Sequence, residues 1–180
     1  MPVPNISYVT AGTRFLASHY NSVKDYLDYL LNPPGASAYR TVAGSLPTAT
    51  WSNSIGMDGE DYDRDGIHDT STNNARMTFT TAGRYRVTAR LTFEPNATGF
   101  RALEVRLNSG GSQTGGTFMT EATATGTTAS KNTTLEQNWS RYFNAGDYIE
   151  MFAYQNSGAT LNYVTGIRRT GIEVLMIGTN

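Results

Sequence analysis

The sequence contains no cysteine and only two histidines. The absence of cysteine excludes disulfide bonds, thiol nucleophiles and cysteine-based metal sites. His19 falls in a predicted helix and His68 in an acidic loop, and no serine lies in the strand–turn–helix pattern that marks a catalytic nucleophile. We therefore expect that the chain is not an enzyme and that it carries no organic cofactor.

The chain also lacks an excess of either charge and any long apolar run. It has 14 Lys and Arg against 15 Asp and Glu, with no basic block that would attract a nucleic acid. No segment approaches the ~20 apolar residues of a membrane-spanning helix. The opening Met-Pro-Val-Pro-Asn does not resemble a signal peptide. We expect a soluble, unprocessed chain with no nucleic-acid partner and no membrane insertion.

Small and β-prone residues are plentiful instead. The 180 residues include 18 glycines and many threonines and asparagines, which favour strands joined by turns. This length suits one full-sized domain with an appendage. The composition predicts a mainly β protein.

Prolines divide the N-terminal part of the chain. Pro2 and Pro4 favour extended backbone, Thr10 is a suitable helix cap, and Pro33-Pro34 would end a helix at the preceding residue. A stretch rich in Pro, Gly, Ala and Ser follows. The predicted divisions are an extended arm over 1–9, a helix over 10–32, a linker over 33–45 and a β domain over 46–180.

The predicted helix carries a row of apolar residues at spacings of 4, 3, 4 and 3. The members of this row are Leu16, Tyr20, Val23, Leu27 and Leu30. The spacing is that of a heptad seam, although an amphipathic helix lying on its own domain shows the same pattern. Phe15, Tyr26 and Tyr29 widen the apolar surface. We expect copies of the same helix, or a larger assembly, to cover it.

Alternation of apolar and polar residues predicts strands through the rest of the chain. In the clearest one, the residues expected to face inward are Tyr85, Val87, Ala89, Leu91 and Phe93. Leu103, Val105 and Leu107 form a second inward set, and Gly171–Gly178 is apolar on both faces, as in an interior strand. About eight to ten short strands separated by turns predict an antiparallel sandwich or jelly roll.

The segment from Phe143 to Gly158 departs from simple alternation. After a turn, Ile149, Met151 and Ala153 face one way, and the other face carries three aromatic residues. These are Tyr148, Phe152 and Tyr154. An aromatic face is unusual on a solvent-exposed surface, so we expect a partner to cover it.

An acidic loop presents carboxylates at alternate positions ahead of Gly66. Asp61, Asp63, Asp65 and Asp69 are the candidate ligands for a calcium ion. The twelfth position of the loop is Thr72, where a helix–loop–helix calcium site has glutamate. A surface loop held by Asx turns explains the same residues. A second loop, Ser109–Gly116, is glycine-rich but lacks the lysine and following helix of a phosphate site, and its role stays open.

Several short segments resemble a known group of domains. They are Gly83-Arg-Tyr85 at the start of a strand, Arg106-Leu-Asn108 at the end of the next, and Ala145–Glu150 before the aromatic strand. They resemble the trimeric jelly roll of the complement globular head and tumour necrosis factor superfamily. The resemblance implies a homotrimer with Tyr148, Phe152 and Tyr154 at the interface.

Over nearly its whole length the chain also resembles small minor structural proteins of tailed phages that infect actinobacteria. The matching blocks are Thr10–Thr13, Tyr20–Leu27, Tyr62–Asn73, Pro95–Arg101 and Tyr154–Gly158. Such proteins are head fibres, decoration proteins or minor tail proteins. The resemblance implies that the apolar row of the helix anchors the trimer to a virion assembled in the host cytoplasm.

Two functions follow as expectations. The first is a non-enzymatic virion protein that decorates or projects from the capsid, bound to the major capsid protein or to tail proteins. The second is a tail-located module that recognises glycans of the host envelope. Capsid and tail locations are not distinguished by the sequence.

Overall fold

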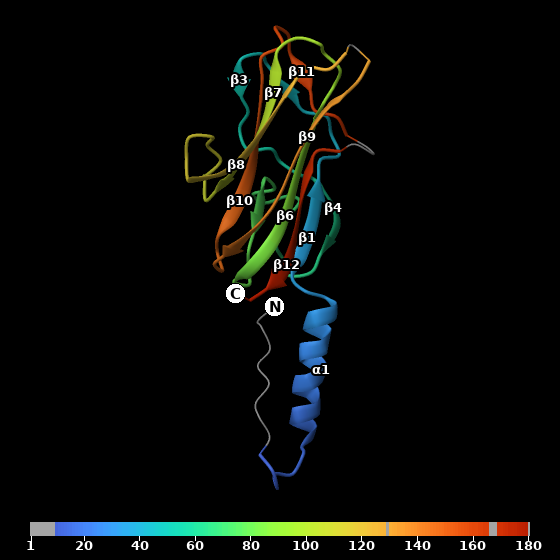
Figure 1. The fold of residues 1–180 in the computed structure, drawn as a ribbon, viewed down its shortest axis with the longest axis vertical. Coiled ribbons are helices and arrows are strands. Elements are labelled where there is room, and N and C mark those ends of the chain that lie inside the picture. Colours follow the sequence, from blue (N-terminus) through green and yellow to red (C-terminus); the bar gives the residue numbers. More distant parts are fainter. Residues whose placement is uncertain (1–9, 129, 166–168, 180) are drawn as a thin grey trace.

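The computed structural model describes residues 10–128, 130–165 and 169–179, which form one helix and twelve strands (Figure 1). The predicted arm at residues 1–9 lies outside the described residues. The elements are α1 Ala17–Leu31, β1 Gly35–Tyr39, β2 Ser45–Leu46, β3 Thr50–Trp51, β4 Gly59–Asp63, β5 Arg76–Thr78, β6 Gly83–Phe93, β7 Phe100–Leu107, β8 Thr117–Thr125, β9 Thr133–Phe143, β10 Tyr148–Gln155, β11 Leu161–Asn162 and β12 Gly171–Gly178.

Two antiparallel sheets face each other as a jelly-roll sandwich. The first has five strands in the order β4-β1-β12-β6-β9, and the second has the order β3-β10-β7-β8, with β5 also paired to β10. The short strands β2 and β11 form a separate pair. The mainly β prediction, with a helix at the N-terminus and a jelly roll after it, is confirmed.

Alternating side chains build the core between the sheets. The five residues of β6 that were predicted to face inward are all fully buried, while Arg84, Arg86 and Arg90 on the other face are exposed. Leu103 and Val105 of β7 meet them from the second sheet. Burial of each such large side chain contributes roughly 1.5–3 kcal/mol. β12 lies between β1 and β6 in the sheet. Its Ile172, Val174 and Met176 are buried in the core, whereas Glu173 and Ile177 on the other face are exposed.

The jelly roll begins earlier than the sequence predicted. β1 occupies residues that were assigned to the linker, and it pairs with both β12 and β4. Its alternation was hidden because its residues are small. Gly35 is required here: a Cβ at this position would lie 2.8 Å from the carbonyl oxygen of Val174 on β12. Close packing of two backbones selects small residues, which in the sequence look like a flexible linker.

The helix begins later than predicted, at Ala17 rather than Thr10. Gly12 has a φ of +85°, and the turn at Thr10–Thr13 is closed by a hydrogen bond from Thr13 N to Thr10 O. The first helical turn is capped instead by His19, whose Nδ1 accepts a hydrogen bond from Leu16 N. The helix ends at Leu31, as the two following prolines require. No helix among the described residues is both long and apolar enough to cross a membrane.

The helix projects from one end of the sandwich, which we call the proximal end (Figure 1). Tyr29 is the only helix residue that is buried, and its hydroxyl contacts Met176 Sδ of β12 at 2.8 Å. The strand β3 lies at the opposite, distal end of the jelly roll. The molecule therefore has two separate ends at which it can meet other molecules.

Candidate functional site

The aromatic face of β10 is covered by the chain itself. Phe152 is fully buried within the single chain, and Tyr148 and Tyr154 are half-buried. The glycine-rich loop 109–116 lies against this face, where Gly110 N donates a hydrogen bond to the Tyr148 hydroxyl at 3.1 Å. The burial of Phe152 on the aromatic face of this strand thus has an explanation within one protomer. The prediction of a trimer interface at Tyr148, Phe152 and Tyr154 remains untested.

Two buried glutamates hold this loop in place. Glu150 accepts hydrogen bonds from the Ser109 hydroxyl and from Gly111 N, the latter at 2.8 Å, and it pairs with Arg76 at 3.2 Å. Glu104, on the neighbouring strand, pairs with Arg106 and accepts a 2.9 Å hydrogen bond from Gln113 Nε2. This role was not predictable from the sequence, because the hydrogen-bond partners come from separate segments of the chain.

The four candidate calcium ligands have different partners. Asp61 accepts hydrogen bonds from Ser37 and Arg169. Asp63 accepts from the backbone N–H groups of residues 65, 67 and 68, at 3.0–3.1 Å. Asp65 accepts from the hydroxyls of residues 80 and 81. Asp69 accepts from the N–H groups of residues 71 and 72. The structure does not bring these four carboxylates together.

His68 is also occupied within the acidic loop. Its Nδ1 lies 2.6 Å from Glu60 Oε1, and its Nε2 lies 3.0 Å from the carbonyl oxygen of Asn74. Both ring nitrogens therefore serve to hold the loop. Among the described residues, no three His, Asp or Glu side chains are placed so that they could hold a metal ion.

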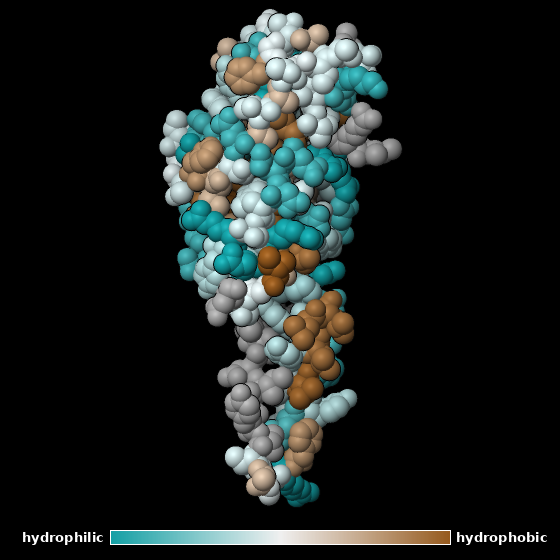
Figure 2. Space-filling model, viewed as in Figure 1, coloured by the Kyte–Doolittle hydropathy of each residue, from teal (hydrophilic) through white to brown (hydrophobic). Residues whose placement is uncertain are grey.

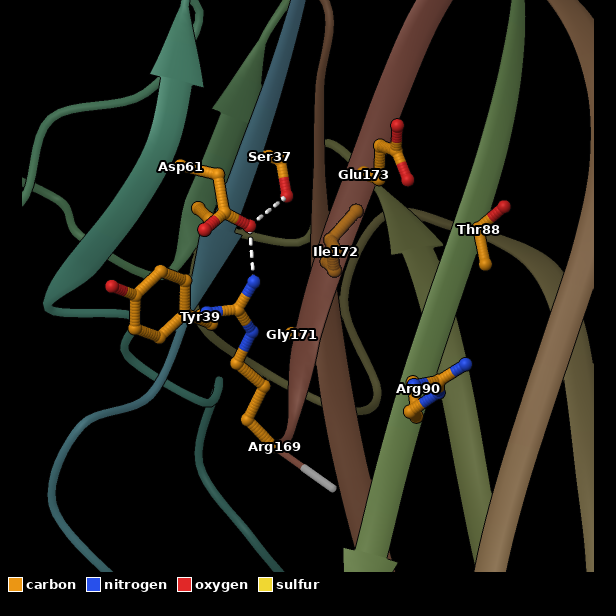
Figure 3. Close-up of a pocket in the computed structure, with 10 residues that line it drawn as sticks. Ser37, Tyr39, Asp61, Thr88, Arg90, Arg169, Gly171, Ile172 and Glu173 are labelled. Atoms are coloured by element: carbon orange, nitrogen blue, oxygen red, sulfur yellow. Dashed lines mark hydrogen bonds and ion pairs between the residues drawn. The ribbon is translucent and has the colours of Figure 1, made fainter. Parts of the chain in front are cut away.

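A shallow hollow of about 180 Å³ lies on the outer face of the five-stranded sheet (Figure 3). Its charged residues pair with one another or with their neighbours. Arg169 bonds to Asp61 and stacks over the Tyr39 ring at 3.8 Å, and Arg90 pairs with Glu136 at 2.7 Å. Glu173 accepts a hydrogen bond from the Tyr62 hydroxyl. These internal pairs make the hollow a weak candidate for a ligand site.

The distal end carries a strip of three aromatic rings across the second sheet, formed by Trp51, Tyr154 and Phe100. Trp51 of β3 pairs directly with Tyr154 of β10, and their ring centroids are 5.3 Å apart. Phe100, the first residue of β7, lies on the other side of Tyr154, also at 5.3 Å. Phe100 is 38% exposed, and the other two rings are half-buried. We call these three residues the aromatic strip.

A pocket of about 450 Å³ opens beside Trp51. Its lining residues are Arg40, Gly44, Ser45, Leu46, Pro47, Thr50, Trp51, Ser52, Asn53, Ser54, Ile55, Gly56 and Tyr163. The lining contains hydroxyls, an amide and a guanidinium, and it contains no carboxylate. Arg40 Nη1 donates to Gly56 O at 2.9 Å, and Nε has no acceptor among the residues that the structure describes. We call this space the distal pocket.

The loops next to the aromatic strip are held by a buried arginine. Arg101 is fully buried, and its guanidinium donates to the carbonyl oxygens of Asn96, Thr98 and Phe100 at 3.0–3.2 Å. Burial lowers the pKa of this guanidinium. The side chain of Asn156 accepts a 2.6 Å hydrogen bond from Phe100 N. The segments 95–101 and 154–158 therefore meet at the distal end.

The apolar row of the helix is exposed along its whole length. The exposed fractions are Leu16 50%, Tyr20 64%, Val23 39%, Leu27 51% and Leu30 56%. Figure 2 shows apolar side chains running down the helix and continuing onto the proximal end of the jelly roll. Exposed apolar surface of this extent is typical of a protein–protein contact.

Replacing Phe152 with alanine is expected to destabilise each protomer by about 3–5 kcal/mol, because the ring is fully buried inside it. Urea denaturation would measure this loss. Phe118→Ala is the matched control, since Phe118 is 51% exposed on β8, and it should change stability little. A Phe152→Ala variant that kept its stability but dissociated into monomers would place this ring at the interface instead.

The acidic loop predicts a specific pH dependence. The N–H groups of Thr72 and Ser71 lower the pKa of Asp69 from 3.8 to about 2. A carboxylate with a lowered folded-state pKa stabilises the fold above pH ~4, and this stabilisation is lost as the pH falls toward 2. In urea denaturation, the stability difference between wild type and Asp69→Asn should therefore be largest above pH 4. A difference that stays constant from pH 6 to pH 2 would contradict this.

Comparisons with known proteins address the fold. No family model matches the chain, and no curated protein sequence matches it. Murine APRIL superposes with a TM-score of 0.60 at 9% identity, covering 80% of this chain and 98% of that one. Eiger TNF from S. frugiperda superposes with a TM-score of 0.55 at 11% sequence identity, covering 82% of this chain and 95% of that one. The globular domain of zebrafish complement 1qA superposes with a TM-score of 0.53 at 12% sequence identity, covering 82% of this chain and 98% of that one. The chain thus has a jelly roll of the tumour necrosis factor and complement globular-head type.

Proposed function

We propose that this chain is a non-catalytic structural protein of a tailed-phage virion, built as a homotrimer and attached through its N-terminal helix. The observation that carries the proposal is the exposed apolar row of α1. Each residue of the row is about half exposed to solvent. The row lies on the side of the helix away from Tyr29, which contacts the jelly roll. Such a surface is stable only when another molecule covers it.

Copies of the same helix fit the row best. With Tyr20 and Leu27 at one heptad position and Leu16, Val23 and Leu30 at the other, the row is a coiled-coil seam of about two heptads. Isolated helices of this length are marginal in water, so the jelly roll must hold them together. Jelly rolls of this type are typically trimeric, which supplies the threefold arrangement.

The proximal end of the sheet extends this contact surface. Ile177 of β12 is 52% exposed and Tyr142 of β9 is 41% exposed. Both lie near Arg84, which pairs with Tyr142 and Gly178 in the sheet register. A trimer that buried the helices would also bury these two side chains.

The virion role rests on the ordered sequence blocks that resemble minor structural proteins of actinobacterial phages. In this role residues 1–32 bind the major capsid protein or a tail protein, and the jelly roll points outward. The protein would then be found in the virion, which is assembled in the host cytoplasm. The arrangement of the helix at one end and open loops at the other supports attachment by one end only.

A tail-located module that recognises host glycans is the second candidate. The observation that favours it is the aromatic strip at the end away from the helix. This candidate shares the same trimer and the same attachment, and it differs in what the distal end contacts.

Leu27→Glu is expected to convert the trimer into a smaller species, because three charges would meet in the seam while the exposed site leaves the protomer fold intact. Light scattering coupled to gel filtration would measure the molar mass. Asn21→Glu is the matched control on the polar side of the helix, and it should remain trimeric. A wild-type protein that is monomeric at tens of micromolar would refute the trimer.

Removal of residues 1–32 should leave a jelly roll that still unfolds cooperatively and no longer joins phage particles. The sandwich keeps its core, since Tyr29 is the only buried helix residue. Mass spectrometry of purified particles from a complemented phage would measure incorporation, and imaging would locate it on capsid or tail. Incorporation at the wild-type level would refute the anchor.

A further inference from the structure

The aromatic strip and the distal pocket form one continuous surface. Trp51 belongs to both, because its ring packs on Tyr154 and its side chain lines the pocket. The surface therefore offers aromatic faces on one side and hydrogen-bonding groups on the other. The pocket volume of about 450 Å³ is in the range that holds small ligands.

The backbone holds this surface in place before any ligand arrives. Ala49 has a φ of +56°, a conformation that non-glycine residues adopt at a cost, and its N–H donates to Gln155 O at 2.7 Å. Gln155 is fully buried and donates to the carbonyl oxygens of Leu46 and Ala159. Ser52 Oγ accepts from Ala153 N at 2.9 Å. A site fixed by such contacts loses little conformational entropy on binding.

The chemistry of the lining restricts the ligand. A single arginine without other cations is a poor site for a polyphosphate or a nucleic acid, and the absence of carboxylates disfavours a basic peptide. The lining is too rich in hydroxyl and amide groups for a lipid chain. A sugar ring fits both the aromatic strip and the distal pocket. Its C–H face packs on an aromatic ring, and its hydroxyl groups need the donors and acceptors of the pocket.

We propose that the aromatic strip and the distal pocket bind a saccharide, with one sugar ring packed on Trp51 and Tyr154. The hydroxyls of this sugar, or of the next one, enter the pocket. Arg40 lines this pocket with its guanidinium, whose Nη1 is held by Gly56 O. Phe100 extends the platform for a further sugar along the strip.

This inference rests on the second candidate function, glycan recognition, which it deepens by naming the residues of the site; it does not depend on the structural role. The site lies at the end of the jelly roll opposite the helix, and every residue named belongs to one chain. The proposal holds for either location on the virion. The Leu27→Glu variant, which tests the trimer, should bind a soluble saccharide as the wild type does.

The experiment uses the full chain and a defined panel: glucose, galactose, mannose, N-acetylglucosamine, glucuronic acid and their β-linked disaccharides. Saturation-transfer NMR would detect binding, and isothermal titration calorimetry would measure the affinity. At least one saccharide is expected to bind with a dissociation constant in the millimolar range or below. Trp51→Ala and Phe100→Ala should each weaken it, by about ten-fold for the tryptophan, and Arg40→Gln severalfold.

Two controls make the result decisive. Phe118→Ala removes an exposed aromatic ring from the same sheet outside the strip, and it should leave the affinity unchanged. Trp51→Phe keeps an aromatic face, and it should retain part of the affinity if Trp51→Ala loses it through stacking rather than unfolding. The proposal is overturned if no saccharide binds at tens of millimolar, or if Trp51→Ala binds as wild type does. It is also overturned if Trp51→Ala lowers the molar mass, because a second copy would then cover the strip.

Discussion

The pairing of β12 with β1 on one side and β6 on the other is the constraint on which the rest of the molecule depends. It joins the last described strand to the first, so the sandwich closes only when both ends of the chain are present. The same strand supplies Met176, which receives Tyr29 of the helix and whose N–H donates to Pro34 O. The direction in which the helix leaves the jelly roll is therefore set by the sheet. Loss of this pairing would therefore disrupt the core of the jelly roll and the attachment of the helix together.

Local alternation was enough to predict the strands whose side chains differ clearly between faces. β6, β7 and β12 lie where the sequence placed them, because large apolar residues alternate with arginine, glutamate and threonine or fill both faces. β1 was missed because close backbone packing requires small residues there, and these look like a linker. The helix start was displaced because Gly12 turns the chain after Thr10.

The candidate sites were harder to predict, since their parts are distant in the sequence. The aromatic face of β10 was predicted to be covered by a partner, and this prediction is untested. Within the chain Phe152 is buried, and the loop 109–116, which is held by Glu150 and Glu104, contacts Tyr148. No pattern in that loop indicates a buried carboxylate on another strand. The aromatic strip likewise combines residues 51, 100 and 154, which only the sheet register brings together. The apolar row of the helix was predictable because its spacing is local, and its exposure is what the structure adds.

Arg101 tethers the loop beside the aromatic strip through three carbonyl oxygens. Every amino acid has such a carbonyl, so the tether does not depend on which side chains the loop carries. Exposed positions such as Ala97 and Thr98 can therefore be substituted while the backbone keeps its path. Exposed residues at the distal end can thus change one at a time during evolution, while the jelly roll keeps its fold. The buried arginine makes the distal end of the molecule both fixed in shape and free to evolve in chemistry.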